Sequence, residues 1–324
     1  MQFAKNTNWK AKMKNGKTIA EEFFYSYASL EHMDNQRNCA LLEKITKKST
    51  NLFVRGGDKI SRNALAFGRH EVDTEELIKA YRENGYNNFL LDIGANIGLI
   101  SCLTGDGFEK IFCYEPNPQV YRILQTNIEI TFGIENHARL NNFGLGEDDT
   151  QLELTVPKKN IGGAYIKQGN TYSNDILLKK DGITDASCAY DYINVSIKNA
   201  KTHMAELFQN VIPFGSRGVI KIDVEGYEPY ILRAIAETLP KDNSCAIIFE
   251  NHDPNIQIND LKGYFTRDIN LHRLSHHPVR AAFKDKSLRR IRAFFGATGH
   301  YTLSKLTEEK DCTGNLLLVA DAQR

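Results

Sequence analysis

The chain has 324 residues, of which 41 are Lys or Arg and 40 are Asp or Glu, so its formal net charge at pH 7 is +1. This balance gives no global basic field that would attract nucleic acid, and polynucleotide substrates are therefore disfavoured. The length is enough for one large α/β unit with an appendage and a sizeable core.

Neither a membrane span nor a secretion signal is expected. No stretch approaches the ~18 apolar residues of a spanning helix, and the N-terminus lacks the apolar core of a signal peptide. The cysteines form no Cys-x-x-Cys pair, which is typical of free thiols in a reducing compartment. We expect a soluble, cytoplasmic protein and leave a peripheral membrane contact open.

Apolar residues recur at helical spacing between residues 18 and 48, with charges between them, as in Ile19, Phe23 and Tyr27. This pattern predicts two amphipathic helices. We interpret residues 1–50 as an N-terminal helical appendage that serves for packing, or alternatively as a lid or dimer surface. The main domain then covers residues 51–324.

Two further signals precede the first core strand. Gly56-Gly57 between short apolar runs predicts a hairpin over Leu52–Ser61. Asp73, with Glu76 three residues later, predicts a capping box at the start of a helix.

Residues 89–98 read as a buried strand that runs into a glycine turn and contains a carboxylate, Asp92. Gly94 permits the turn, and Gly98 permits close packing of the next helix and backbone approach to a ligand. Asn96 occupies the place of the second glycine in the dinucleotide fingerprint, which disfavours a pyrophosphate. The pattern indicates a nucleoside site, although a generic strand-to-helix turn is the competing interpretation.

Glu115 ends the next apolar strand, in Lys-Ile-Phe-Cys-Tyr-Glu-Pro-Asn-Pro. A carboxylate at the end of the second strand of a βαβ unit can accept hydrogen bonds from both ribose hydroxyls. The alternative is a solvated strand end.

The rest of the chain alternates between strand and helix patterns, as a doubly wound sheet requires. Strands are predicted at residues 88–93, 110–114, 138–143, 219–224, 245–250, 271–274 and 316–320, and helices from residue 97, at 118–132 and at 229–238. Pro118 and Gly133 mark the two ends of the second helix. A less regular insertion covers about 151–210.

A third motif, Gly-Val-Ile-Lys-Ile-Asp-Val-Glu-Gly-Tyr-Glu, covers residues 218–228. Together with residues 90–98 and Tyr114–Pro118, it resembles the ordered signatures of the FkbM-type S-adenosylmethionine-dependent methyltransferases. The resemblance covers roughly Leu52 to Glu250. It implies a Rossmann-like, doubly wound, mostly parallel seven-stranded sheet, S-adenosylmethionine as cofactor, and methyl transfer to an oxygen, often of a sugar or secondary metabolite.

The positions of these motifs at the ends of the predicted strands suggest a set of cofactor contacts. Asp92 and Asn96 are expected at the turn and the methionine end, and Glu115 with Asn117 at the ribose. Asn142 and Phe143 are expected to flank the adenine, although the glycine run after them only approximates the family pattern. The full set is Asp92, Gly94, Ala95, Asn96, Gly98, Glu115, Asn117, Asn142, Phe143 and Asp223.

Methyl transfer from a sulfonium is an in-line displacement that needs positioning and a base for the hydroxyl proton. The candidate catalytic residues are Asp223, Glu225, Glu250 and His252. We favour Asp223 as the base and expect Glu225 and Glu228 to brace the following turn. Strand alternation places Lys221 on the same side as Asp223, where it should pair with a carboxylate.

The insertion at about 151–210 and the basic segment at about 276–300, with Arg280, Lys284, Arg289 and neighbours, are expected to shape the acceptor site. The charge run is either a solvated helix face or a contact for an anionic acceptor. His272, His276 and His277 fit no common zinc spacing, so no metal is expected.

The most plausible function is O-methylation of a saccharide or related small molecule. The alternatives are a nicotinamide-dependent oxidoreductase and a non-catalytic cofactor-binding module. The acceptor and the oligomeric state do not follow from the sequence.

Overall fold

The computed structural model describes residues 7–14, 17–25, 40–41, 51–55, 58–158, 160–172, 190–253, 256–277, 300–306 and 312–323. The chain divides into two units, residues 1–49 and residues 50–324. The helices in the described ranges are too short or too polar to cross a bilayer.

The first unit contains an antiparallel hairpin of β1 (Thr7–Lys14) and β2 (Lys17–Tyr25). The helix predicted from residue 18 is therefore wrong over β2. The physical reason lies in the partner strand, where Trp9, Ala11 and Met13 alternate with lysines at the two-residue period of a strand. Most of the second predicted helix lies outside the described residues.

The second unit is built on an eight-stranded mixed sheet in the order β13-β12-β14-β11-β10-β3-β4-β5. Its strands are β3 (Phe89–Ile93), β4 (Lys110–Tyr114), β5 (Ala138–Asn141), β10 (Arg217–Ile222), β11 (Ser244–Asn251), β12 (Ile269–His277), β13 (His300–Lys305) and β14 (Gly314–Ala320). The run from β11 to β5 is parallel, and β14, β12 and β13 pair antiparallel. The doubly wound α/β fold is thus confirmed.

The predicted seven strands become eight because β13 adds an outer strand to β12. Tyr301 and Leu303 in β13 are 37% and 43% exposed. A short edge strand with little burial carries a weak hydrophobic signal, which explains why the sequence did not show it.

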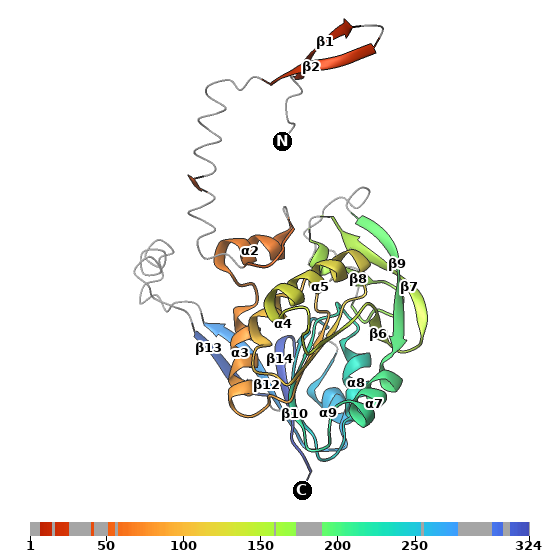
Figure 1. Cartoon of the computed structure of the whole chain (residues 1–324). Helices are drawn as coiled ribbons and strands as arrows, with labels where there is room; N and C mark the ends of the chain where they lie inside the picture. Colours follow the sequence, from red (N-terminus) through yellow and green to blue (C-terminus); the bar gives the residue numbers. More distant parts are fainter. Residues whose placement is uncertain are drawn as a thin grey trace, which may run out of the picture. The chain divides into compact units, whose positions relative to one another are not determined.

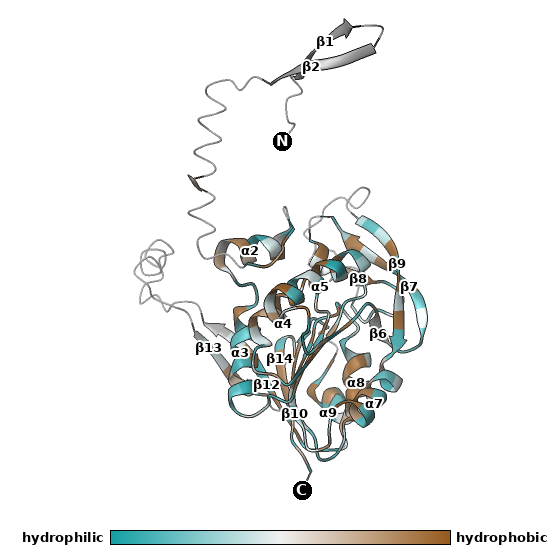
Figure 2. Ribbon diagram, viewed as in Figure 1, coloured by the Kyte–Doolittle hydropathy of each residue, from teal (hydrophilic) through white to brown (hydrophobic). Residues whose placement is uncertain are grey.

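Helices cover both faces of this sheet (Figure 1). On one face lie α3 (Val72–Glu83), α4 (Leu99–Thr104) and α5 (Pro118–Phe132), and on the other lie α7 (Ala200–Asn210), α8 (Glu228–Thr238) and α9 (Ile258–Tyr264). In Figure 2 the covering helices carry both hydrophobic and hydrophilic residues, as amphipathic helices on a sheet require.

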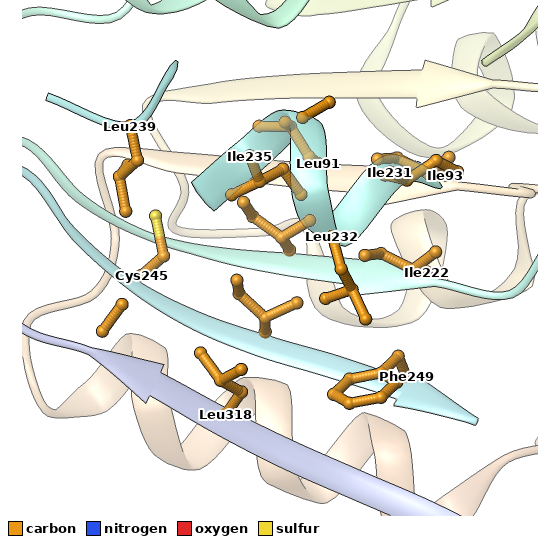
Figure 3. Close-up of a cluster of buried hydrophobic side chains, with 14 of the residues drawn as sticks. Leu91, Ile93, Ile222, Ile231, Leu232, Ile235, Leu239, Cys245, Phe249 and Leu318 are labelled. Atoms are coloured by element: carbon orange, nitrogen blue, oxygen red, sulfur yellow. The ribbon is translucent and has the colours of Figure 1, made fainter. Parts of the chain in front are cut away.

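The larger core lies between the sheet and α7, α8 and α9. Figure 3 shows side chains of β3, β10, β11 and β14 meeting those of α8, with Leu91, Ile222 and Leu318 opposite Ile231, Leu232 and Ile235. Each of these six side chains is at most 1% exposed. Replacement of one by alanine would cost about 2–5 kcal/mol. The core therefore holds the strand ends that form the site in fixed positions.

Two predictions before the first core strand need correction. Residues 59–67 form α2 (Lys59–Phe67) instead of the second half of a hairpin, because Asp58 caps this helix by accepting from Ser61 N at 2.9 Å. Helix α3 is present, but it begins at Val72 without a capping box. Asp73 instead accepts from Asn315 Nδ2 at 2.9 Å, a contact that sequence spacing cannot show.

The insertion forms a second, four-stranded sheet in the order β6-β9-β7-β8. It consists of β6 (Gly144–Gly146), β7 (Thr150–Pro157), β8 (Tyr165–Ile166) and β9 (Tyr190–Asn199), with a 3₁₀ turn, η1 (Ile161–Gly163), between β7 and β8. Asp58 Oδ1 accepts from Ile161 N at 3.1 Å and so joins the start of α2 to η1.

Other predictions concern cysteines and the basic segment. Cys102, Cys113, Cys245 and Cys312 are buried free thiols, as expected. Cys39, Cys188 and the basic residues between 280 and 292 lie outside the described residues.

Candidate active site

The carboxyl ends of β3 and β10 meet at Gly94. Gly94 has φ +80°, and a Cβ atom built there would lie 1.8 Å from the backbone oxygen of Asp223. Gly94 N and Ala95 N both donate to Tyr114 O, at 3.0 and 2.9 Å, which ties this turn to the end of β4. Only glycine fits at position 94, so three strand ends converge around one turn.

Asn96 continues the turn in a left-handed conformation, with φ +52°. Asparagine tolerates this conformation better than most residues. Its side-chain oxygen accepts from Ile97 N at 2.8 Å, while its backbone N donates to Glu115 Oε2 at 3.0 Å. At Gly98 a Cβ atom would lie 2.7 Å from Leu124, so glycine here lets α4 pack close to α5.

Glu115 is buried and lines the cleft beside this turn. Its two oxygens accept from Asn96 N at 3.0 Å and Asn117 N at 2.8 Å. Burial raises the pKa of Glu115 to about 7, and these backbone hydrogen bonds partly oppose the rise. Each oxygen keeps a second lone pair, so the carboxyl group can still accept from a ligand's hydroxyls.

Five of the ten expected cofactor residues lie outside the cleft lining, namely Asp92, Gly98, Asn117, Asn142 and Phe143. Asn117 caps α5 by accepting from Gln119 N at 3.0 Å, and Asn142 Nδ2 donates to the backbone oxygen of Glu115 at 2.8 Å. The ring of Phe143 packs edge-on against Tyr114, with centroids 5.8 Å apart. The cleft wall next to Glu115 is instead apolar and comes from Pro116, Val120, Leu145, Leu154, Ile197 and Tyr227. Much of this wall belongs to the second sheet, which the motifs did not indicate.

Lys221 lies inside β10 with a side chain that is only 6% exposed. Its ammonium is 3.3 Å from Asp223 Oδ2 and 3.6 Å from Asp92 Oδ1, and it donates to Gly94 O at 3.1 Å. Burial alone would lower the pKa of Lys221, but the carboxylates of Asp223, Asp92 and Glu71 outweigh burial and raise it. The lysine therefore stays charged and pairs as strand alternation predicted.

Asp92 lies beneath the cleft surface. It is fully buried, accepts from Ser101 Oγ at 2.7 Å and lies outside the cleft lining. Its contacts are those of a group that orients Lys221 from below, rather than those of a direct ligand.

The segment after β10 has unusual backbone geometry. Glu225 has φ +53° and Gly226 has φ +99°, and a Cβ atom at Gly226 would lie 2.0 Å from Asn170 Oδ1. Glu228, at the start of α8, accepts from Gly226 N at 2.8 Å. Burial raises the pKa of Glu228 to about 8. Glu228 braces this turn as expected, whereas Glu225 lines the cleft.

The cleft around Gly94 and Glu115 is the first compartment of the site, and a second compartment adjoins it. Asp223 and Glu225 line both compartments, and Glu250 at the end of β11 lines only the second. His252 Nε2 lies 2.8 Å from Glu250 Oε2. Tyr172 packs on the His252 ring, with centroids 5.7 Å apart. His252 lies outside the lining of the second compartment and would act through Glu250.

Residues just before and within the first turn of α3 also line the site, although the sequence motifs did not indicate them. His70 and Glu71 line both compartments, and Glu75 lines the first. Burial raises the pKa of Glu71 to about 7, with Lys221 opposing the rise. Glu71 and Glu75 are four residues apart, a spacing that places both on one helix face, but the sequence does not show that this face meets the cleft.

The charges of the first compartment decide which ligand fits. Its carboxyl groups are Glu71, Glu75, Glu115, Asp223 and Glu225, and Lys221 is already held by Asp92 and Asp223. Such a lining repels a pyrophosphate and suits a ligand that carries positive charge. A sulfonium nucleoside with an amino acid side arm has this charge, with a flat apolar base for the wall near Leu154. Within the described ranges, no three His, Cys, Asp or Glu side chains group as a metal site requires.

A family model described as the Methyltransferase FkbM domain matches residues 92–296. No curated protein matches the chain. A solved structure of an FkbM methyltransferase from Methylobacillus flagellatus KT is 14% identical, with 89% of this chain and 60% of that chain covered and a TM-score of 0.34. A precorrin-6y C5,15-methyltransferase from Geobacter metallireducens is 10% identical, with 84% and 95% covered and a TM-score of 0.39.

Proposed function

The chain belongs to the FkbM methyltransferase family, whose model covers well over half of it, and we propose that it transfers the methyl group of S-adenosylmethionine to a hydroxyl of a saccharide or related small molecule. The observation that carries this proposal is the position of Asp223. Asp223 lines both the first and the second compartment, so this one residue could face both partners of a group transfer.

The proposed cofactor position follows from the strand order. The backbone turn at Gly94–Asn96 would lie along the middle of the cofactor, with Glu115 at the ribose and the apolar wall around Leu154 and Ile197 at the adenine. When bound, S-adenosylmethionine supplies an activated methyl group on a positively charged sulfur. The surrounding carboxylates favour that charge over a neutral or anionic ligand.

The acceptor hydroxyl would enter from the second compartment, and Asp223 would take its proton. Lys221, 3.3 Å from Asp223 Oδ2, fixes the orientation of this carboxylate. A positioned base contributes about 10²–10⁴ to the rate, and alignment of the reacting atoms contributes more. Glu250, which lines the same compartment and lies 2.8 Å from His252 Nε2, is the second base candidate.

The second compartment also bears on the acceptor class. Glu71, Asp223, Glu225 and Glu250 line it together with polar groups such as Thr74 and Asn315. Carboxylates and amides hydrogen-bond well to neutral hydroxyls and repel a phosphate next to the reacting oxygen. These residues support a neutral polyhydroxy compound at the point of transfer. The basic segment lies outside the described residues, and its contact with an anionic acceptor stays a prediction.

The test measures cofactor binding first and transfer second. Calorimetry with S-adenosylmethionine should show binding to the wild-type protein and at least tenfold weaker binding to Glu115→Ala, because two hydroxyl acceptors are lost. Radiolabelled methyl transfer to a panel of neutral sugars, amino sugars and sugar phosphates should then favour an uncharged hydroxyl compound. Enhanced NADH fluorescence without S-adenosylmethionine binding would support the oxidoreductase alternative instead, and binding without transfer to any hydroxyl would support a non-catalytic module.

A further inference from the structure

Glu75 in α3 is a buried carboxylate with one oxygen unused. The residue is 1% exposed, and Arg69 Nε lies 2.5 Å from Glu75 Oε2. Glu75 Oε1 has no hydrogen-bond partner among the described residues. Glu75 lines the first compartment of the site.

An unused carboxylate oxygen at such depth is costly. Leaving a buried acceptor unsatisfied destabilises a protein by about 1–3 kcal/mol, and more for a charged group. Each such atom in a native structure needs an explanation, and completion by a bound ligand is one. Arg69 contacts one oxygen, so the carboxylate is held in place with its second oxygen available for a ligand.

The strand order shows which part of the ligand reaches Glu75. The sheet places β10, β3, β4 and β5 side by side in that order, and Glu115 with the apolar wall lies at the β4 and β5 side. Helix α3 packs on α4 and β10, at the opposite end of the cleft. On the proposed function, the nucleoside would therefore lie away from α3, and the amino acid arm of the cofactor would extend toward it.

The charges around Glu75 also favour an ammonium group at the α3 end of the cleft. Glu71 lies one turn before Glu75, and Glu75 N donates to Glu71 O at 2.9 Å. Both carboxyl groups line the first compartment, and Lys221 at this end is already paired with Asp92 and Asp223. An arriving ammonium would add positive charge beside Glu71 and Glu75, and one of its three N–H donors could satisfy Oε1.

We infer that Glu75 Oε1 accepts a hydrogen bond from the α-ammonium of the methionine moiety, so that α3 supplies a cofactor-selecting residue. This inference rests on the proposed function, because it assumes that the cleft binds S-adenosylmethionine. Arg69 acts as a positioning residue for the Glu75 carboxylate.

The experiment compares two ligands and three proteins by calorimetry. The ligands are S-adenosylhomocysteine and its des-amino analogue, 4-(5′-adenosylthio)butanoate. The proteins are the wild type, Glu75→Gln and the control Glu76→Gln, which loses the other, exposed ion pair of Arg69. Thermal melts of all three check folding.

Glu75→Gln should weaken S-adenosylhomocysteine binding about 10- to 100-fold, the usual cost of a hydrogen bond to a charged group. The same variant should bind the des-amino analogue within threefold of wild type, because the contact that it loses is already absent. Glu76→Gln should leave both affinities unchanged. In the wild type, removal of the amine alone should cost a similar factor, and an unchanged affinity would overturn the inference even where Glu75→Gln does not fold.

Equal weakening of both ligands by Glu75→Gln would overturn the inference and assign Glu75 a role in the fold only. Unchanged binding of S-adenosylhomocysteine would overturn it as well. Failure of the wild type to bind either ligand would refute the proposed function itself, which separates the two claims.

Discussion

The two ends of the cleft are built on different principles. At the β4 and β5 end the lining is mostly apolar, with Leu145, Leu154 and Ile197 around a single carboxyl group, Glu115. At the β10 and α3 end the lining is charged, with Glu71, Glu75, Asp223 and Glu225 around Lys221. On the proposed function, one end would hold the ligand by excluding water from it, and the other by matching its charge.

The turn at Gly94 joins the two ends, and its disruption should have the largest effect. Gly94→Ala would put a Cβ atom 1.8 Å from Asp223 O in a left-handed backbone conformation. We expect a loss of about 5 kcal/mol in the free energy of unfolding, measured in urea. Gly133→Ala is the matched control, because Gly133 has φ +85° but its Cβ would meet nothing within 4 Å. A similar loss in both variants would mean that the conformation, and not the close approach, explains the glycine.

Asp223 at the charged end is expected to govern turnover without governing affinity. Asp223→Asn should lower kcat about 10²–10⁴-fold, the usual contribution of a general base. Cofactor affinity should change only a few-fold, as measured by calorimetry. Asp242→Asn, at an exposed turn, serves as the control. Unchanged turnover would transfer the role of base to Glu250 with His252.

The protonation of Glu228 should have the next largest effect, which is on the free energy of unfolding. The folded-state pKa of Glu228 is about 8 and its ordinary value is 4.5, so the folded state favours the neutral carboxyl group. The resulting stability is complete below pH 4.5 and is lost as the pH rises through 8. Between pH 5.5 and 7.5 the wild type should lose about 1.4 kcal/mol per pH unit relative to Glu228→Gln. A difference between the two proteins that stays constant with pH in urea titrations would contradict this prediction.

The apolar end should give the smallest effect. Leu154→Ala removes part of the wall proposed for the adenine and should weaken S-adenosylhomocysteine binding by about 1–2 kcal/mol, or about 5- to 30-fold. The affinity of Leu154→Ala for the des-amino analogue should fall by the same factor. Ionic strength should change this loss of affinity little. Leu303→Ala, on the exposed edge strand β13, is the control. A loss limited to the ligand with the amine would contradict the division between the two ends.

Local sequence signals predicted the parts of the site that a single strand and turn define. Gly94, Asn96 and Glu115 lie where the motifs placed them, because buried strand, left-handed turn and terminal carboxylate are consecutive features of the chain. Lys221 also paired as predicted, since strand alternation fixes its side. These predictions needed no knowledge of which distant segments meet.

The remaining parts depend on contacts between distant segments. The wall from β7 and β9, and the carboxylates of α3, reach the cleft only through the packing of whole elements. The sequence predicts Asn142 and Phe143 at the adenine because they end the strand expected at residues 138–143. Strand β5 ends at Asn141 instead, and Gly144 and Leu145 line the cleft. The sequence does not predict the hairpin β1–β2, because the apolar residues of β2 also fit helical spacing and only the two-residue period of β1 indicates a strand.

The excess of carboxylates over available lysine also has a consequence after the reaction. Methyl transfer removes the positive charge of sulfur, so the spent thioether meets the same negative lining with less attraction than the sulfonium did. On the proposed function, this loss of attraction weakens product inhibition and speeds exchange of used for fresh cofactor.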